Sequence, residues 1–258
     1  MPIEFVPLLQ IQLELYRLPR GPERFQAYLQ AMVAPGGREL RLPPLVAMNP
    51  MGREHLPARL EAWLALDAEV LGARAAATVP WDGSLGRLKL GLVIADDVKG
   101  GWTNRYTSEM THRFPNPKAL KSGWLAGVLW ASEAPTAEAV TLEVRSVIWR
   151  ATYIAAHGAA CSLRAMLAQE GWVMAKSGCA PAKTPGRLDE GGRIIAAEEI
   201  AKIRATIRPH LDATDPPTLI PCLFGDPAAE ALGHRPLGLP ESAGFALALH
   251  DVLGNSPA

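Results

Sequence analysis

The stretch Leu88–Ala95, LKLGLVIA, decides how the rest of the sequence is interpreted. Its second half is apolar without alternation, so neither face of a strand formed there would be polar. Such an uninterrupted run is typical of a strand that is buried on both faces of a parallel sheet. We therefore expect a central strand here, with Val93 and Ile94 almost fully buried.

Three further segments are strand candidates, at residues 41–48, 124–131 and 218–224. Pro43, Pro44 and Pro221 weaken the first and the last of them, because a proline cannot donate a ladder hydrogen bond. Residues 6–18 fit either a strand or a helix, and we favour the helix. Apolar residues recur at helical spacing over residues 22–33, 57–77, 136–156, 162–176 and 194–211.

Short apolar strands separated by amphipathic helices predict an α/β fold, with a small, mainly parallel sheet that is covered by helices. Several predicted helices lie between the third and fourth strand candidates, so residues 133–213 form a helical insertion or subdomain in this prediction. The chain has 258 residues and shows no internal repeat, so we expect a single α/β domain over residues 1–258.

The composition argues against several classes of protein. With 26 basic and 26 acidic residues the formal net charge is zero, which provides no field for general binding to nucleic acid or to an anionic membrane. The longest stretch without Asp, Glu, Lys or Arg, residues 151–163, is too short to span a bilayer. Cys161, Cys179 and Cys222 are too few and too widely spaced for a disulfide framework. We expect a cytoplasmic protein that binds neither nucleic acid nor membrane.

Polar residues follow every strand candidate. In open parallel sheets, ligands bind outside the carboxyl ends of the strands, so the candidate site belongs there. These ends contribute Asn49, Ser132 and Asp226 as ligand-binding candidates, besides the adjacent pair Asp96 and Asp97. Each of the first three, taken alone, is better explained by the preference of turns for such residues.

The segment after the central strand candidate, residues 96–112, is richer in polar groups than a turn requires. It reads DDVKGGWTNRYTSEMTH. Glycines let the backbone approach a ligand closely, and a helix N-terminus that follows Lys99 favours a negative charge. The residues expected to bind an anionic ligand here are Gly100, Gly101, Trp102, Thr103, Asn104 and Arg105. A capped turn with a solvated basic face is the alternative.

Asp96 and Asp97 place two like charges at the end of a buried strand, where they require a compensating neighbour. Because adjacent side chains at a strand end diverge, we expect one carboxylate to face the pocket as a general base or metal ligand. The other should be structural, and should cap the Gly100-Gly101 turn or pair with Lys99 or Arg105. The candidate catalytic residues are Asp96, Asp97, Lys99 and His112.

Glu109 and His112 have the spacing Glu-x-x-His, which would place a carboxylate and an imidazole on one face of a helix. A di-iron site needs two such pairs, but a mononuclear site with a carboxylate from residues 96–97 would suit Mg, Mn, Fe or Zn. The alternative is a ladder of Arg105, Glu109 and Arg113, in which Glu109 is an ion-paired surface residue.

Other familiar catalytic motifs are absent from the sequence. It contains no G-x-S-x-G elbow, no G-x-G-x-x-G and no Walker spacing, so there is no nucleotide fingerprint. Cys222 lies within an apolar run and is expected to be an inert buried thiol, whereas Cys161 and Cys179 have no assigned role. After His112, His55 is the histidine nearest to a predicted strand end.

Three functions remain compatible with these patterns. The first is an enzyme that acts on a small anionic organic molecule, centred on the loop from Asp96 to Arg105. The second is a non-catalytic ligand-binding or homo-oligomeric module, in which the helical residues 136–211 form a homodimer or partner surface. The third is a metal-dependent oxygenase or hydrolase that uses Glu109 and His112, with a divalent metal as cofactor.

Overall fold

The computed structural model describes residues 3–34, 36–37, 39–81, 83, 85–98, 103–115, 117–179 and 196–254. The chain divides into two compact units. The first, here called the sheet unit, comprises Met1–Ser108 and Lys118–Thr152. The second, the helical unit, comprises Glu109–Pro117 and Tyr153–Ala258. A single-domain organisation of residues 1–258 stays a prediction.

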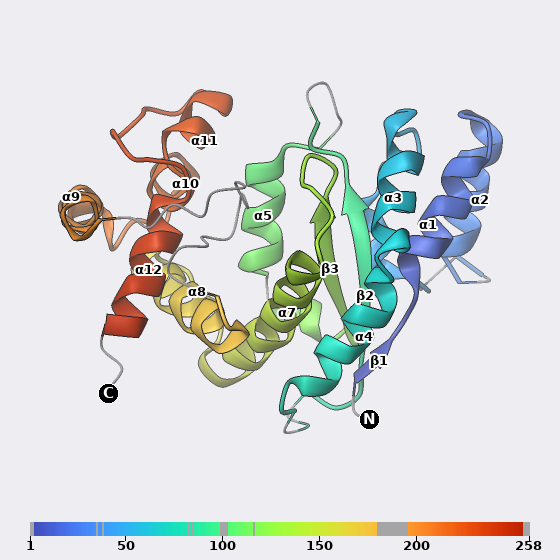
Figure 1. The fold of residues 1–258 in the computed structure, drawn as a ribbon, viewed down its shortest axis with the longest axis horizontal. Helices are drawn as coiled ribbons and strands as arrows, with labels where there is room; N and C mark the ends of the chain where they lie inside the picture. Colours follow the sequence, from blue (N-terminus) through green and yellow to red (C-terminus); the bar gives the residue numbers. More distant parts are fainter. Residues whose placement is uncertain are drawn as a thin grey trace. The chain divides into compact units, whose positions relative to one another are not determined.

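The sheet unit contains a three-stranded parallel sheet (Figure 1). Its strands are β1 (Ile3–Phe5), β2 (Leu88–Ala95) and β3 (Trp124–Trp130), in the order β1-β2-β3. β2 is therefore central, and Val93 and Ile94 are 0% and 1% exposed, as predicted. The α/β class, with a small parallel sheet covered by helices, is confirmed.

Helices make up most of the remaining chain. In chain order they are α1 (Leu8–Arg17), α2 (Pro22–Met32), the 3-10 helix η1 (Pro43–Ala47), α3 (His55–Ala65), α4 (Ala68–Thr78), α5 (Arg105–Arg113), α6 (Pro117–Leu120), α7 (Ala137–His157), α8 (Leu163–Ser177), α9 (Ala197–Ile207), the 3-10 helix η2 (Arg208–His210), α10 (Pro216–Phe224), α11 (Asp226–Ala231) and α12 (Ala243–Gly254). The helix predicted at residues 57–77 is two helices, because Asp67 takes a left-handed conformation, φ 54°, between α3 and α4.

Two predicted strands are wrong. Residues 41–48 contain η1, and residues 218–224 belong to α10. The start of α10 is well capped, because the side chain of Asp215 accepts a hydrogen bond from Thr218 N at 3.1 Å. Residues 219–224 are all buried, and an uninterrupted apolar run suits a buried helix as well as a buried strand. The predicted helical insertion therefore does not lie between two strands.

Two helices of the sheet unit pack closely against opposite faces of β2. A Cβ atom on Gly91 would lie 2.3 Å from Leu8 of α1, and a Cβ on Gly72 of α4 would lie 3.3 Å from Leu92. Because successive strand residues point to opposite faces, α1 covers one face of β2 and α4 the other. The close approach of α1 requires glycine at position 91.

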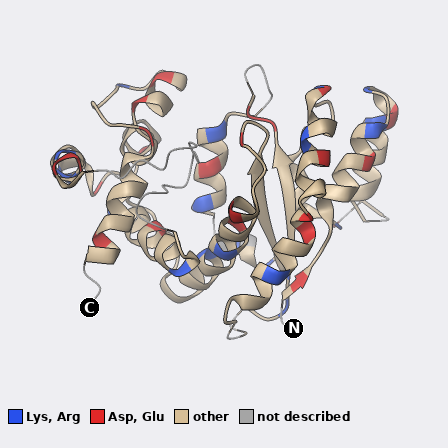
Figure 2. Ribbon diagram, in the orientation of Figure 1, with Lys and Arg blue, Asp and Glu red and all other residues tan. Residues whose placement is uncertain are grey.

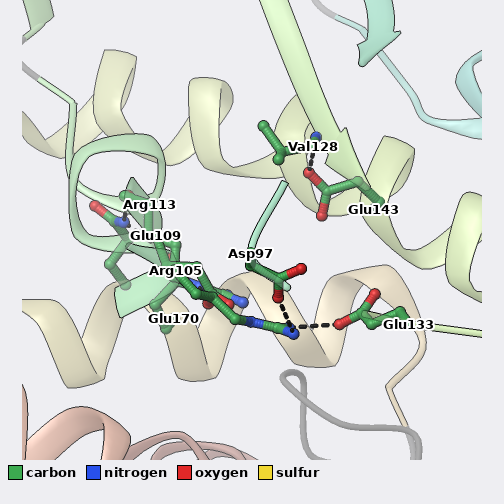
Figure 3. A network of polar contacts seen from close by, with 9 residues as sticks. Asp97, Arg105, Glu109, Arg113, Val128, Glu133, Glu143 and Glu170 are labelled. Atoms are coloured by element: carbon green, nitrogen blue, oxygen red, sulfur yellow. Dashed lines mark hydrogen bonds and ion pairs between the residues drawn. The ribbon is translucent and has the colours of Figure 1, made fainter. Parts of the chain in front are cut away.

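Two polar side chains replace missing strand partners at the edges of the sheet. Beyond Phe5, β1 no longer pairs with β2, and there Gln12 of α1 bonds both peptide groups of Ile94. Its Nε2 donates to Ile94 O at 2.7 Å, and Ile94 N donates to its Oε1 at 2.9 Å. On β3, Val128 N donates to Oε1 of Glu143 from α7 at 2.8 Å (Figure 3). Gln12 thereby fixes the carboxyl end of the central strand.

Charges of both signs occur together along the helices (Figure 2). α5 shows this most clearly, because Arg105, Glu109 and Arg113 follow one another at intervals of one turn. No helix among the described residues is long and apolar enough to cross a membrane.

Candidate functional site

The carboxyl ends of β2 and β3 bring Asp97 and Ser132 together. Ser132 N donates to Asp97 Oδ1 at 2.9 Å, and Ser132 Oγ donates to Asp97 Oδ2 at 2.6 Å. Arg105, at the start of α5, donates to Asp97 Oδ2 at 3.3 Å and to Oε1 of Glu133 (Figure 3). Its guanidinium also lies 5.0 Å from the ring centre of Trp130. The expected pairing of one aspartate with Arg105 is thus present.

These four residues, Asp97, Arg105, Ser132 and Glu133, form a strand-end network that joins β2, β3 and α5. The side chains of Asp97 and Arg105 are only 4% and 16% exposed. An incoming anion would have to compete with two carboxylates for the guanidinium of Arg105. In this geometry Asp97 and Arg105 connect the ends of β2 and β3 to the start of α5.

Asp96 makes different contacts from Asp97 and is almost fully buried. Its side chain is 1% exposed, and its Oδ1 lies 2.9 Å from Nε2 of His55, the first residue of α3. The side chain of His55 is 31% exposed, so its imidazole connects a buried carboxylate with the surface. We call this pair the Asp96–His55 dyad.

The second carboxylate oxygen of Asp96 is the unusual feature of the dyad. Oδ2 is buried and has no hydrogen-bond partner among the described residues. Leaving a buried polar atom unpaired costs about 1–3 kcal/mol, and more for a charged group, so such atoms are rare and require an explanation. Both oxygens of Asp97, by contrast, accept hydrogen bonds.

Helix α1 contributes Gln12 and Tyr16 to the surroundings of the dyad. Gln12 bonds the strand end before Asp96, and Tyr16 follows one turn later on the same helix. The hydroxyl of Tyr16 donates to Asn49 O at 2.8 Å. Burial, and then the nearby Asp96 carboxylate, raise the pKa of the Tyr16 phenol well above its ordinary value, so it stays a neutral donor. Asn49 closes its own turn, because its Oδ1 accepts a hydrogen bond from Met51 N at 2.9 Å.

The geometry of the dyad suits general acid–base chemistry. A carboxylate only accepts hydrogen bonds, so Nε2–H of His55 donates to Asp96 Oδ1 and the neutral ring carries its lone pair on Nδ1. Nδ1 has no hydrogen-bond partner in the described part of the chain. A proton taken up at Nδ1 creates an imidazolium, which the adjacent carboxylate stabilises.

Only part of the predicted anion-binding loop can be placed. Lys99, Gly100, Gly101 and Trp102 lie outside the described residues. Thr103 N donates to the backbone oxygen of Asp96 at 3.3 Å. Asn104 caps α5, since its Oδ1 accepts a hydrogen bond from Thr107 N at 3.1 Å. The described end of the loop is therefore a helix start.

The predicted metal ligand Glu109 is engaged by an arginine. Arg113 Nε donates to Glu109 Oε2 at 2.8 Å, and Arg113 Nη1 donates to Glu170 Oε2 at 2.8 Å (Figure 3). This confirms the ion pair between Glu109 and Arg113, although Glu109 is 6% exposed and not a surface residue. Within the described ranges, no group of three or more His, Cys, Asp or Glu residues could hold a metal ion. A metal site at Glu109 and His112 stays a prediction.

Asp226 does not follow a strand, because α10 precedes it. It starts α11 in the helical unit, where its two side-chain oxygens accept hydrogen bonds from Leu237 N at 2.8 Å and Gly238 N at 2.9 Å. These contacts hold a loop against the start of α11. The prediction that Asp226 lies at the end of a strand is wrong, because that prediction took the buried helix α10 for a strand.

A groove of about 1130 Å³ lies at the amino ends of the strands, where Glu4, Lys89 and Trp124 contribute to its lining. These residues are neighbours across β1, β2 and β3, and Lys89 Nζ lies 5.5 Å from the ring centre of Trp124. The groove is at the opposite end of β2 from Asp96. Parallel sheets bind ligands at their carboxyl ends, so the dyad is a better candidate for the functional site than this groove.

The sequence patterns made His112 a stronger candidate than His55 and predicted no role for Gln12 or Tyr16. The dyad joins residues that are 41 positions apart, and the only sequence signal was the place of His55 near a predicted strand end.

No family model matches the chain, and no curated protein or solved structure shows significant similarity to it.

Proposed function

We propose that the chain is an enzyme that uses His55 as a general base or acid on a small organic molecule at the carboxyl ends of the sheet. The observation that supports this most directly is the Asp96–His55 dyad. One imidazole nitrogen is held by a carboxylate that is 1% exposed, and the ring itself is 31% exposed. The second nitrogen is therefore the proton-transfer atom.

A purely structural role explains the dyad less well. A carboxylate that only stabilises the fold is expected to have both oxygens paired, as Asp97 does. Asp96 instead has one oxygen without a partner among the described residues, and its other oxygen contacts the half-exposed imidazole of His55. A catalytic role is one explanation for a buried polar atom without a partner.

The sequence beside Asp96 supports an anionic substrate. Residues 99–121 contain five Lys or Arg and a single acidic residue, Glu109, within a chain of zero net charge. We propose that Lys99 and the amides of Gly100 and Gly101 receive the anion, because Arg105 is already held by Asp97 and Glu133.

Nitrogen NMR of the imidazole tests the dyad without a substrate. In protein labelled with ¹⁵N at histidine, His55 should show the tautomer that is protonated at Nε2. Asp96→Asn should change this tautomer population, whereas His234→Gln, in the helical unit, should leave the His55 signals unchanged. A wild-type His55 protonated at Nδ1 instead would refute the proposed base.

Turnover of a panel of small carboxylate esters and phosphate monoesters tests the reaction. His55→Gln should slow the turnover of an accepted compound by about 10²–10⁴-fold, and His234→Gln should not slow it. Binding of a panel member without turnover, unchanged in His55→Gln, would support the non-catalytic ligand-binding module instead.

We also propose that the protein acts in the cytoplasm. Cys161 and Cys222 are free thiols, and Cys161 is exposed. Burial raises the pKa of the Cys222 thiol to about 11, which keeps it unreactive. An exposed free thiol is compatible with a reducing compartment.

A further inference from the structure

A second cavity lies within the helical unit, among α8, α9 and α12. Its volume is about 410 Å³, which is within the range of small-molecule sites. Its lining is largely apolar and includes Leu167, Ile207 and Leu247, which are 9%, 0% and 4% exposed. The cavity therefore has a mainly apolar lining and a volume that suits a small organic molecule.

Three guanidinium groups line the same cavity, from Arg164, Arg204 and Arg208. Arg204 is engaged by Asp251 of α12 through two hydrogen bonds. Arg164 meets Asp212 at 3.1 Å, but these side chains are 61% and 89% exposed, so the pair is weak. The side chain of Arg208 has no hydrogen bond or ion pair in the part of the chain that the structure describes.

One carboxylate, that of Asp251, also lines the cavity. It faces Arg204 and lies 3.3 Å from Nδ1 of His250, so its charge is already compensated. Arg164 pairs with Asp212 and Arg204 pairs with Asp251. Arg208 is therefore the arginine of this largely apolar lining whose charge has no partner among the described residues. This combination is complementary to a molecule with an apolar body and one negative group.

We propose that this cavity binds an amphipathic carboxylate. The carboxylate pairs with Arg208 and the hydrocarbon body lies on the apolar residues of α8, α9 and α12. This site uses none of the residues of the Asp96–His55 dyad, so it holds or fails independently of the proposed enzymatic function.

Isothermal titration with octanoate, 1-octanol and octylammonium tests the site on the full chain. Octanoate should bind, and 1-octanol and octylammonium should bind at least about fivefold more weakly, because they lack the anion. Arg208→Gln should weaken octanoate binding about fivefold and leave 1-octanol unchanged. Arg235→Gln, an exposed arginine of the same unit outside the lining, should change neither. Ala168→Trp, which fills the cavity, should abolish the binding of all three compounds.

Failure of octanoate to bind, equal binding of octanoate and 1-octanol, or equal effects of Arg208→Gln and Arg235→Gln would overturn the proposal. Arg208 is exposed and makes no described side-chain contact, so its variant should fold whatever the outcome for Ala168→Trp. Sedimentation of the same proteins distinguishes a further occupant. A dimer of wild type that Ala168→Trp dissociates would assign the cavity to a second copy of the chain and overturn the proposal.

Discussion

Two buried carboxylates, Glu170 in the helical unit and Asp96 in the sheet unit, are held by different kinds of side chain. Glu170 is 0% exposed and meets the guanidinium of Arg113, which also holds Glu109. The other oxygen of Glu170 accepts a hydrogen bond from Gln169 Nε2 at 3.1 Å. Asp96 has an imidazole on one oxygen and no described partner on the other.

The difference separates groups that hold the fold from groups that can react. A guanidinium stays charged at every pH at which the protein is folded, so Arg113 neutralises its carboxylates permanently. The imidazole of His55 has a second ring nitrogen that can accept or donate a proton, and this nitrogen has no hydrogen-bond partner among the described residues. Stability should therefore depend on the first arrangement and function on the second.

The largest expected effect is the removal of Arg113. Arg113→Met leaves two buried carboxylates without their guanidinium and should lower the free energy of unfolding by about 3–5 kcal/mol. Arg164→Met, which breaks the exposed pair with Asp212, is the matched control and should cost less than about 1 kcal/mol. Urea unfolding measures both, and equal losses would contradict the contrast between buried and exposed pairs.

Removal of the charge of Asp97 should have a smaller effect. Asp97→Asn weakens the strand-end network with Ser132 and Arg105, so the free energy of unfolding should fall by about 1–3 kcal/mol. Activity per folded molecule should be retained. A variant that unfolds like wild type would show that the network does not hold the strand ends.

The corresponding change at Asp96 should affect stability least among the aspartates. Asp96→Asn removes a charge with one oxygen that has no partner among the described residues, so the free energy of unfolding should change by less than about 1 kcal/mol. Turnover, in contrast, should be lost. If Asp96→Asn destabilises the protein more than Asp97→Asn, the assignment of roles to the two aspartates is reversed.

Glu69 is a third partly buried carboxylate, and backbone amides bind it where a guanidinium binds Glu170 and an imidazole binds Asp96. Its Oε1 accepts hydrogen bonds from Leu9 N and Gln10 N at the start of α1, but burial raises the pKa of Glu69. A raised pKa in the folded state means that the associated stability is complete below the unfolded-state pKa and is lost as the pH rises through the folded-state pKa.

Glu69→Gln keeps an acceptor oxygen and removes this titration. The melting temperatures of wild type and Glu69→Gln should be similar near pH 4, and the variant should be slightly more stable near pH 7. Thermal unfolding followed by circular dichroism at both pH values measures this. A variant that loses stability at pH 7 would show that the charge contributes more to capping α1 than its burial costs.

Local patterns predicted the central parts of the fold. The apolar run Leu88–Ala95 predicted the buried central strand, and the pair Asp97 and Arg105 that follows it is only eight positions apart in sequence. The strand Ile3–Phe5 carries no such pattern, because three residues are too few to show a period. Residues 218–224 were misassigned because burial on all sides removes the periodicity that distinguishes a helix from a strand.

The candidate site could be predicted only in part for the same reason. Asp96 and Asp97 were recognisable from their position after an apolar strand, but which of them was structural depends on Ser132 and His55. His55 reaches Asp96 only because η1 and α3 fold back to the carboxyl end of β2. No local pattern contains a contact between residues 41 positions apart.

Gln12 and Glu143 also close the sheet to additional strands. Unpaired N–H and C=O groups along a sheet edge can recruit a strand from another molecule, which leads to edge-to-edge aggregation. At Ile94 both backbone groups bond Gln12, and at Val128 the N–H bonds Glu143. Both side chains come from helices, and a helix cannot continue the ladder. At these two positions, the protein is therefore protected from self-association through its strands.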